Sequence, residues 1–72
     1  MEEKLINSEI KKIITLYENL NFKKALQEAN STKSKHQQLE TSNFYLNLIG
    51  LIHLALKDWE NSILFFNKAK NF

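Results

Sequence analysis

The feature that most constrains the fold of this 72-residue chain is a pair of apolar runs joined by a short polar hinge, within residues 46–69. The first run is apolar in almost every direction around a helical axis, so other helices must cover it on several sides. The hinge is Lys57-Asp58, where the Asp58 carboxylate can accept a hydrogen bond from an amide of the following first turn. The stretch therefore predicts two antiparallel helices that pack as a hairpin.

The composition favours an all-α fold. The chain has no proline, one glycine and 43% hydrophobic residues, which opposes both disorder and a β-rich structure with tight turns. Residues 1–72 make one domain at most, and a chain this short buries only about 60% of its unfolded surface. Exposed apolar side chains therefore matter to its stability. The absence of cysteine excludes disulfides and thiolate metal sites.

The first half of the chain predicts another pair of helices. Asn7 or Ser8 can cap the first, which should end near residues 19–21, and the second should run from Phe22 to about Leu39 although its later part is polar. The apolar stripe of the first helix recurs at steps of three and four and consists of Ile10, Ile13, Ile14 and Tyr17.

The second half predicts the third and fourth helices. Thr41 or Ser42 can cap the third helix, and the fourth should run from Trp59 to about Asn71. The small Ser62 should allow the last two helices to approach closely. The inward-facing residues predicted for the fourth helix are Trp59, Ile63, Phe66 and Ala69.

The two halves are similar to each other at an offset of 37 residues. Phe22 matches Trp59 and Ala25 matches Ser62, so each second helix begins with an aromatic residue that is followed three positions later by a small one. The ring can fill the hinge end of a hairpin while the small residue lets its helices close. The chain is therefore interpreted as two copies of one hairpin.

The second copy resembles the tetratricopeptide repeat family. The family's spaced residues fall here on Leu46, Ile49, Gly50, His53, Ser62, Phe66 and Ala69. The sequence departs from the family at His53, Ser62 and Lys57, which replace a tyrosine, an alanine and a glycine. The resemblance implies two stacked antiparallel hairpins in a right-handed superhelix, with repeats at about 7–39 and 42–71. The alternative is a closed four-helix bundle, in which the third helix would not lie between the second and the fourth.

The resemblance also implies a binding groove between the first helices of the two repeats, which would hold a helix or an extended peptide. We expect Leu51 and Leu54 to be exposed there and Ile10 and Ile14 to be interior. The implied groove residues are Asn7, Ile10, Ile14, Tyr17, Phe44, Asn47, Leu51 and Leu54. The predicted function is thus that of a protein–protein interaction or scaffold module.

A second apolar surface is expected on the outer side of the fourth helix. Leu64 and Phe65 lie beside or opposite its inward stripe, and Phe72 follows it. A terminal repeat needs a polar outer face to stay soluble. This association face is therefore predicted to pack on another copy, making a homo-oligomer, or on a further chain segment.

Other functional classes have weaker support in the sequence. His36 and His53 have no carboxylate or histidine partner at helical spacing, so no metal, cofactor or catalytic site is predicted. Ten lysines suggest nucleic-acid binding as an alternative, which the absence of arginine weakens. A third alternative is the adaptor segment of a longer enzyme.

The expected location is the cytoplasm. Residues 1–4 are charged and do not begin a secretory signal, and the apolar region 45–56 is shorter than the roughly 18 residues that a membrane span requires.

Overall fold

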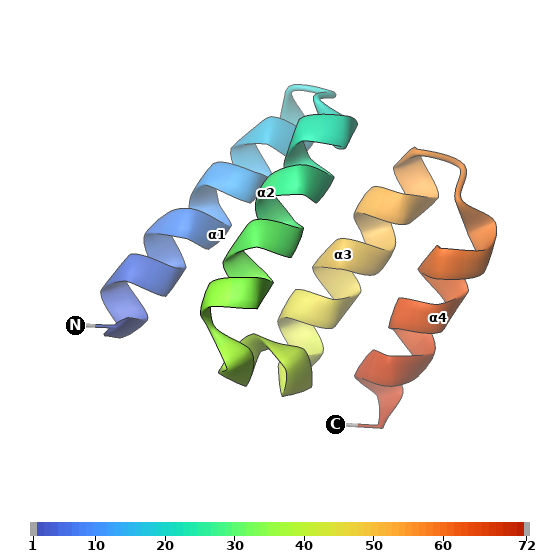
Figure 1. Ribbon diagram of the computed structural model, residues 1–72. Coiled ribbons are helices and arrows are strands. Elements are labelled where there is room, and N and C mark those ends of the chain that lie inside the picture. Colours follow the sequence, from blue (N-terminus) through green and yellow to red (C-terminus); the bar gives the residue numbers. More distant parts are fainter. Residues whose placement is uncertain (1, 72) are drawn as a thin grey trace.

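The computed structural model describes residues 2–71, with side chains from residue 5 onward, and this part of the chain is entirely helical (Figure 1). No strand occurs within residues 2–71, which confirms the predicted all-α class. The elements are α1 (Glu2–Glu18), α2 (Phe22–Lys35), the 3₁₀-helix η1 (Gln37–Thr41), α3 (Asn43–Ala55) and α4 (Trp59–Lys70).

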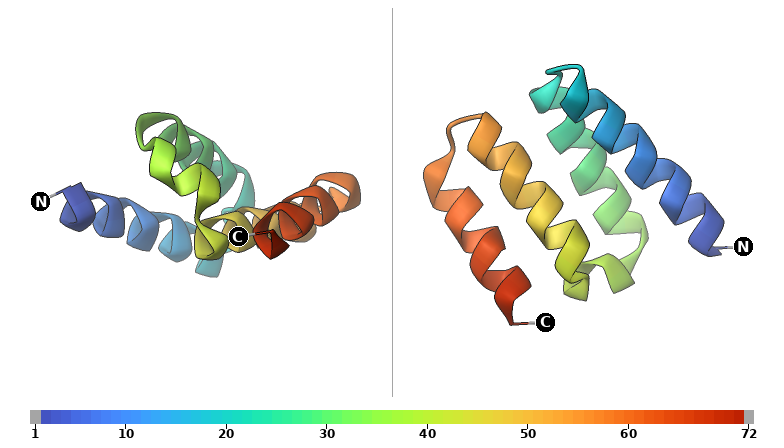
Figure 2. Two further views of the ribbon diagram at one scale, coloured as in Figure 1. Left: turned by 90° about the horizontal axis from the view of Figure 1, so that it is seen from below. Right: turned by 180° about the vertical axis from the view of Figure 1, so that it is seen from behind.

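The helices form two antiparallel hairpins that pack side by side. α1 pairs with α2 and α3 with α4, while α3 also packs against α2. In Figure 1, α1 and α4 lie at opposite ends of the row, and Figure 2 shows α2 in a layer apart from α1 and α3. The third helix therefore lies between the second and the fourth. This arrangement confirms the prediction of two stacked hairpins and differs from the alternative, a closed four-helix bundle.

The two hinges have the same backbone conformation. Each contains one residue in the left-handed region, Leu20 at φ 66° and Lys57 at φ 62°. The next residue donates its N–H to the carbonyl five positions earlier, over 2.9 Å in the first hinge and 2.8 Å in the second. This pattern closes a helix by satisfying its last carbonyls. The hinges are 37 positions apart (57 minus 20), so the internal repeat is present in the backbone itself.

The core lies where α3 meets both helices of the first hairpin. Tyr45 is fully buried, and its hydroxyl donates a hydrogen bond of 2.6 Å to the carbonyl of Ala29 in α2. Burial raises the pKa of Tyr45 to about 12. The buried apolar residues of this cluster are Ile6, Ile13, Ala25, Ala29, Leu39, Tyr45, Leu48, Ile49 and Ile52.

The start of α1 differs from the prediction. The helix begins at Glu2, so Asn7 and Ser8 lie inside it as exposed residues and not at its cap. Ile6 explains the difference, because this side chain belongs to the core and is 7% exposed. Tertiary packing thus extends the helix through residues that are suited to capping.

The end of α2 also differs. The helix ends at Lys35 and not near Leu39, which is instead buried in η1. The break lies beside Glu9 of α1, whose carboxylate is 3.2 Å from Nε2 of His36 and 3.9 Å from Nζ of Lys35. Burial of Leu39 and these contacts with α1 bend the chain where the sequence shows polar residues alone.

The predicted caps of the second hairpin are confirmed. The Ser42 hydroxyl accepts a hydrogen bond of 3.2 Å from the N–H of Tyr45, which selects Ser42 over Thr41. The Asp58 carboxylate accepts one of 3.5 Å from the N–H of Asn61 and one of 2.8 Å from its side-chain amide. Both helices thus begin with a side chain that satisfies a first-turn amide.

Candidate protein-binding face

The central helix α3 carries no lysine, arginine, aspartate or glutamate between Asn43 and Ala55. The first hairpin covers one of its sides and α4 covers another. Its third side is open, because Phe44 is 60% exposed and Leu51 and Leu54 are each 41% exposed. Leu51 and Leu54 are thus exposed as predicted, and the half-buried Asn47 lies on the same side.

Close packing of α4 on α3 depends on Gly50. A Cβ atom at this position would lie 2.7 Å from Cε1 of Phe66, so the ring occupies the space that any side chain would need. Ser62 and Ala69 are buried at the same contact, and the Ala69 carbonyl accepts a hydrogen bond of 2.7 Å from the side-chain amide of Asn43. Small residues therefore let the two helices approach, as predicted for Ser62.

Trp59 and Ile63 do not face inward, and this prediction is wrong. They are 57% and 58% exposed, since α4 has one main helical neighbour and Ser62 and Ala69 already occupy its narrow buried side. The steps of four and three from Trp59 through Ile63 to Phe66 place these residues on one flank of α4.

That flank continues the open side of α3. On the opposite flank of α4, the Phe65 ring stacks on His53 of α3. Between the two flanks, Phe66 of α4 meets Gly50 of α3. Trp59 and Ile63 therefore lie beyond Phe66 on the side away from His53, which is the side of Leu54. We call the combined surface the apolar face, and it consists of Phe44, Leu51, Leu54, Trp59 and Ile63.

Phe65 is covered in the structure, contrary to its predicted place on an uncovered association face. Its ring lies 5.4 Å from that of His53 at an interplanar angle of 13°. The ammonium groups of Lys33 and Lys68 lie 5.0 and 5.1 Å from its ring centroid. The ring is thus half-buried among residues of three helices. The covering residues come from distant parts of the sequence, so the spacing within α4 gave no signal of them.

The other members of the predicted association face have different outcomes. Leu64 is 49% exposed and lies on the side of α4 away from α3. Phe72 lies outside the described residues. Leu64 is therefore a single exposed apolar side chain on this side, in contrast to the five residues of the apolar face.

The α1 side of the predicted groove is less open than the α3 side. Ile10, Ile14 and Tyr17 are half-buried and pack against the core. The Tyr17 ring meets that of Phe22 edge to face, with centroids 5.4 Å apart. Asn7 is exposed. The apolar groove residues predicted on α1 are thus partly covered and those on α3 are exposed, whereas Asn7 is exposed and Asn47 is half-buried.

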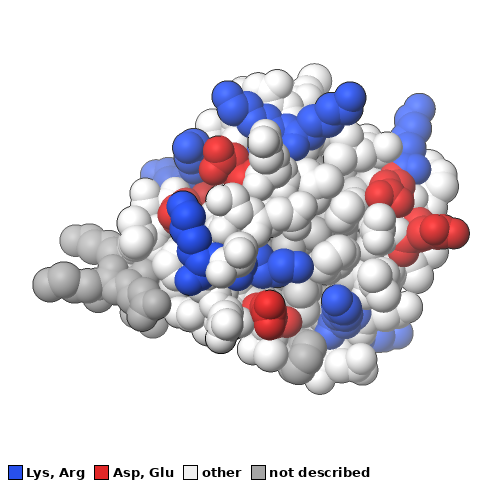
Figure 3. Space-filling model, in the orientation of Figure 1, with Lys and Arg blue, Asp and Glu red and all other residues white. Residues whose placement is uncertain are grey.

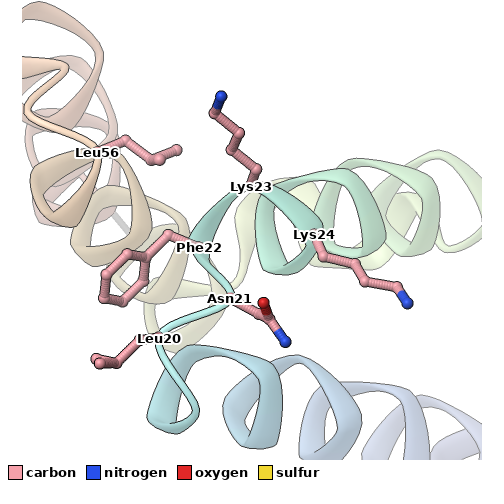
Figure 4. A pocket seen from close by; sticks show the side chains of 6 residues that line it. All are labelled: Leu20, Asn21, Phe22, Lys23, Lys24 and Leu56. Atoms are coloured by element: carbon pink, nitrogen blue, oxygen red, sulfur yellow. The ribbon is translucent and has the colours of Figure 1, made fainter.

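A hollow of about 390 Å³ lies at the first hinge, between Leu20, Phe22 and Leu56 (Figure 4). Lys23 and Lys24 stand at its edge, and Figure 4 shows their ammonium groups pointing in different directions away from the Phe22 ring. The lysines therefore do not converge on a shared anion site.

The charged side chains are of both signs. Figure 3 shows lysines interspersed with acidic residues over the face seen in Figure 1. Some of them pair, such as Lys12 with Glu28 at 3.8 Å and Lys35 with Glu9 at 3.9 Å. This mixture of signs contrasts with the uncharged apolar face.

The histidines have structural partners. Nδ1 of His53 lies 3.3 Å from a carboxylate oxygen of Asp58, and His36 lies against Glu9. Hydrogen bonds from Asn61, with a smaller contribution from His53, lower the pKa of the Asp58 carboxyl. Among the described residues, no three histidine or acidic side chains are grouped to hold a metal ion.

Within residues 2–71, every helix falls short of the length and apolarity needed to cross a membrane. Comparison of the sequence with protein-family models, with curated proteins and with solved structures found no match. The resemblance to tetratricopeptide repeats therefore stays a prediction, which the internal repeat and the stacked hairpins support.

Proposed function

We infer that this chain is a protein–protein interaction module that binds helical partners on its apolar face. The observation that carries the proposal is the central helix α3, which has no lysine, arginine or acidic residue and leaves Phe44, Leu51 and Leu54 exposed. Exposed apolar patches that continue over two elements are typical of interaction sites. Trp59 adds a large aromatic group at the edge, a residue type that often dominates binding energy.

The chemistry of the face favours a helix over an extended peptide. An extended segment gains most from a host that pairs with its backbone N–H and C=O groups, whereas a helix satisfies these groups internally. The apolar face offers side chains alone, and the nearby Asn47 amide already donates to Asn43 over 3.2 Å. A helix that presents an uncharged stripe is therefore the better fit.

The surface favours this function over nucleic-acid binding. Phosphate contacts require cations that are available to a ligand, and Lys12 and Lys35 are shared with carboxylates of the same chain. The chain also contains no arginine, the residue that makes bidentate contacts with phosphates and bases. We expect no salt-dependent binding in a fluorescence titration with short single-stranded and duplex oligonucleotides.

Site-directed photo-crosslinking tests the proposal. A photoreactive phenylalanine analogue replaces Leu51 in the centre of the face, and in a matched variant it replaces Ser34, which is exposed on α2 away from the core. Irradiation in cells that make the chain should give discrete protein adducts from position 51 and none of the same mass from position 34. Equal adduct patterns from both positions, or no adduct from position 51, would contradict the proposal.

A further inference from the structure

We propose that the partner on the apolar face is a second copy of this chain, related to the first by a twofold axis. This inference rests on the proposed function, because it uses the same surface. It states what the surface binds and how the two chains are arranged.

The internal repeat shows that one flank of the second hairpin is less covered than its counterpart in the first. At the offset of 37 residues, Trp59 and Ile63 correspond to Phe22 and Leu26 of the first hairpin. Phe22 and Leu26 are half-buried, whereas Trp59 and Ile63 are 57% and 58% exposed. The first hairpin has α3 packed beside it, and within residues 2–71 no helix follows α4 to play the same part.

A second copy cannot supply that element by stacking head to tail. The residues that α3 buries against the first hairpin are Tyr45, Leu48, Ile49 and Ile52. Their counterparts on α1, 37 positions earlier, are Ser8, Lys11, Lys12 and Thr15. All four counterparts are polar and exposed. Head-to-tail stacking would bury two lysines against apolar side chains, which is strongly unfavourable. Copies therefore do not extend into a filament through these surfaces.

A twofold arrangement avoids this cost, since it places the apolar face against itself. Each copy presents the same five apolar side chains, none of which carries a charge. The partner also consists of helices, whose backbone groups are already satisfied. The five residues of the face are apolar, and the amide of the neighbouring Asn47 already donates to Asn43, so a second apolar surface is the complement that they fit.

The size of the face fits a stable dimer. A standard interface buries about 800 Å² per chain, of which about 57%, or roughly 450 Å², is apolar. Five side chains that are 41–60% exposed, at roughly 150–200 Å² each, present about 450 Å². An interface of this size covers about a sixth of the 5098 Å² surface of the chain.

Sedimentation equilibrium over a range from low micromolar to millimolar chain tests the inference. The mass should rise with concentration from the 8.5 kDa of one chain and level off at twice that value. Emission of Trp59, the single tryptophan, should shift to shorter wavelength over the same range as its indole leaves water. A mass that stays at one chain, or that continues to grow beyond two, would overturn the twofold dimer.

Matched lysine substitutions locate the interface. Leu54→Lys and Ile63→Lys place a charge within the face and should weaken the dimer by about 30-fold or more. Leu64→Lys changes an equally exposed leucine on the other side of α4 and should leave the dimer unchanged. Circular dichroism verifies that each variant retains its helicity. Loss of the dimer in Leu64→Lys, with retention in Leu54→Lys, would show that the outer side of α4 is the interface.

Photo-crosslinking from position 51 separates the failure of this inference from that of the proposed function. An adduct with the mass of two chains supports both. An adduct with a different protein, together with a monomeric mass at all concentrations, keeps the interaction function and overturns self-association. Absence of any adduct from a monomeric and fully helical chain overturns both.

Discussion

Substitution of Gly50 by alanine should destabilise the fold, although alanine normally stabilises a helix. The added Cβ would lie 2.7, 2.8 and 3.1 Å from three ring atoms of Phe66, whereas ordinary contacts begin at 3.4 Å. The ring must therefore retreat by about 0.7 Å at its closest atom, the difference between 3.4 and 2.7 Å. Overpacking of this kind costs about 1–3 kcal/mol, and the helix propensity of alanine returns about 1 kcal/mol. We expect a net loss of up to about 2 kcal/mol.

A double-mutant cycle isolates the contact. In a Phe66→Leu background the ring is absent, so Gly50→Ala should become neutral or stabilising by up to about 1 kcal/mol. The free energy of unfolding is measured by urea titration with far-ultraviolet circular dichroism, at one protein concentration because association adds to apparent stability. The control is Asn67→Ala at an exposed position of α4, which should stabilise the protein by about 0.5 kcal/mol in both backgrounds. The same effect of Gly50→Ala with and without Phe66 would refute the close-packing argument.

Four further predictions concern the core, one hinge and one helix cap. Tyr45→Phe should cost about 1 kcal/mol in urea titration, because a buried hydrogen bond to the carbonyl of Ala29 is lost. The pKa of Tyr45 in the folded state, about 12, exceeds the reference value of 10.0. The stability of the wild-type protein should therefore fall as the pH rises from 10 to 12, by roughly 3 kcal/mol in total. If the stability of Tyr45→Phe falls equally over this pH range, the fall is not due to the hydroxyl of Tyr45. Lys57→Gly should raise the thermal midpoint, since glycine relieves a left-handed conformation that costs about 1 kcal/mol, while Glu60→Gly within α4 should lower it. Ser42→Ala should destabilise by about 1 kcal/mol in urea titration, and a change within error would show that the cap hydrogen bond contributes nothing.

The helices were predictable because their signals are local, and the repeat was predictable because the two halves of the sequence can be compared directly. The starts of α2 and α4 and the Ser42 and Asp58 caps depend on turn chemistry within a few positions. The left-handed residues Leu20 and Lys57 were not predicted, because neither is a glycine. The start of α1 was missed because the burial of Ile6 depends on distant helices.

The candidate site was predictable in part. An apolar stripe shows which side of a helix prefers to be buried, but it does not show whether a neighbour covers it. Leu51 and Leu54 were placed correctly because α3 has more apolar directions than neighbours. Trp59 and Ile63 were placed wrongly because α4 has a single main neighbour, which the small Ser62 and Ala69 contact. The internal repeat was the available signal. Trp59 and Ile63 match Phe22 and Leu26, which are half-buried because another hairpin lies beside their helix.

The hydrogen bond from Tyr45 to Ala29 also determines which parts of the chain open together. It joins a side chain of the second hairpin to the backbone of the first, so neither α2 nor α3 can leave without breaking this buried hydrogen bond. α4 has no comparable bond to the first hairpin among the hydrogen bonds of the described residues. In native-state hydrogen exchange, the amides of α2 and α3 should therefore exchange as one unit, while those of α4 exchange through a separate opening of lower free energy. The unit of cooperative unfolding is then the contact between the hairpins, not either hairpin alone.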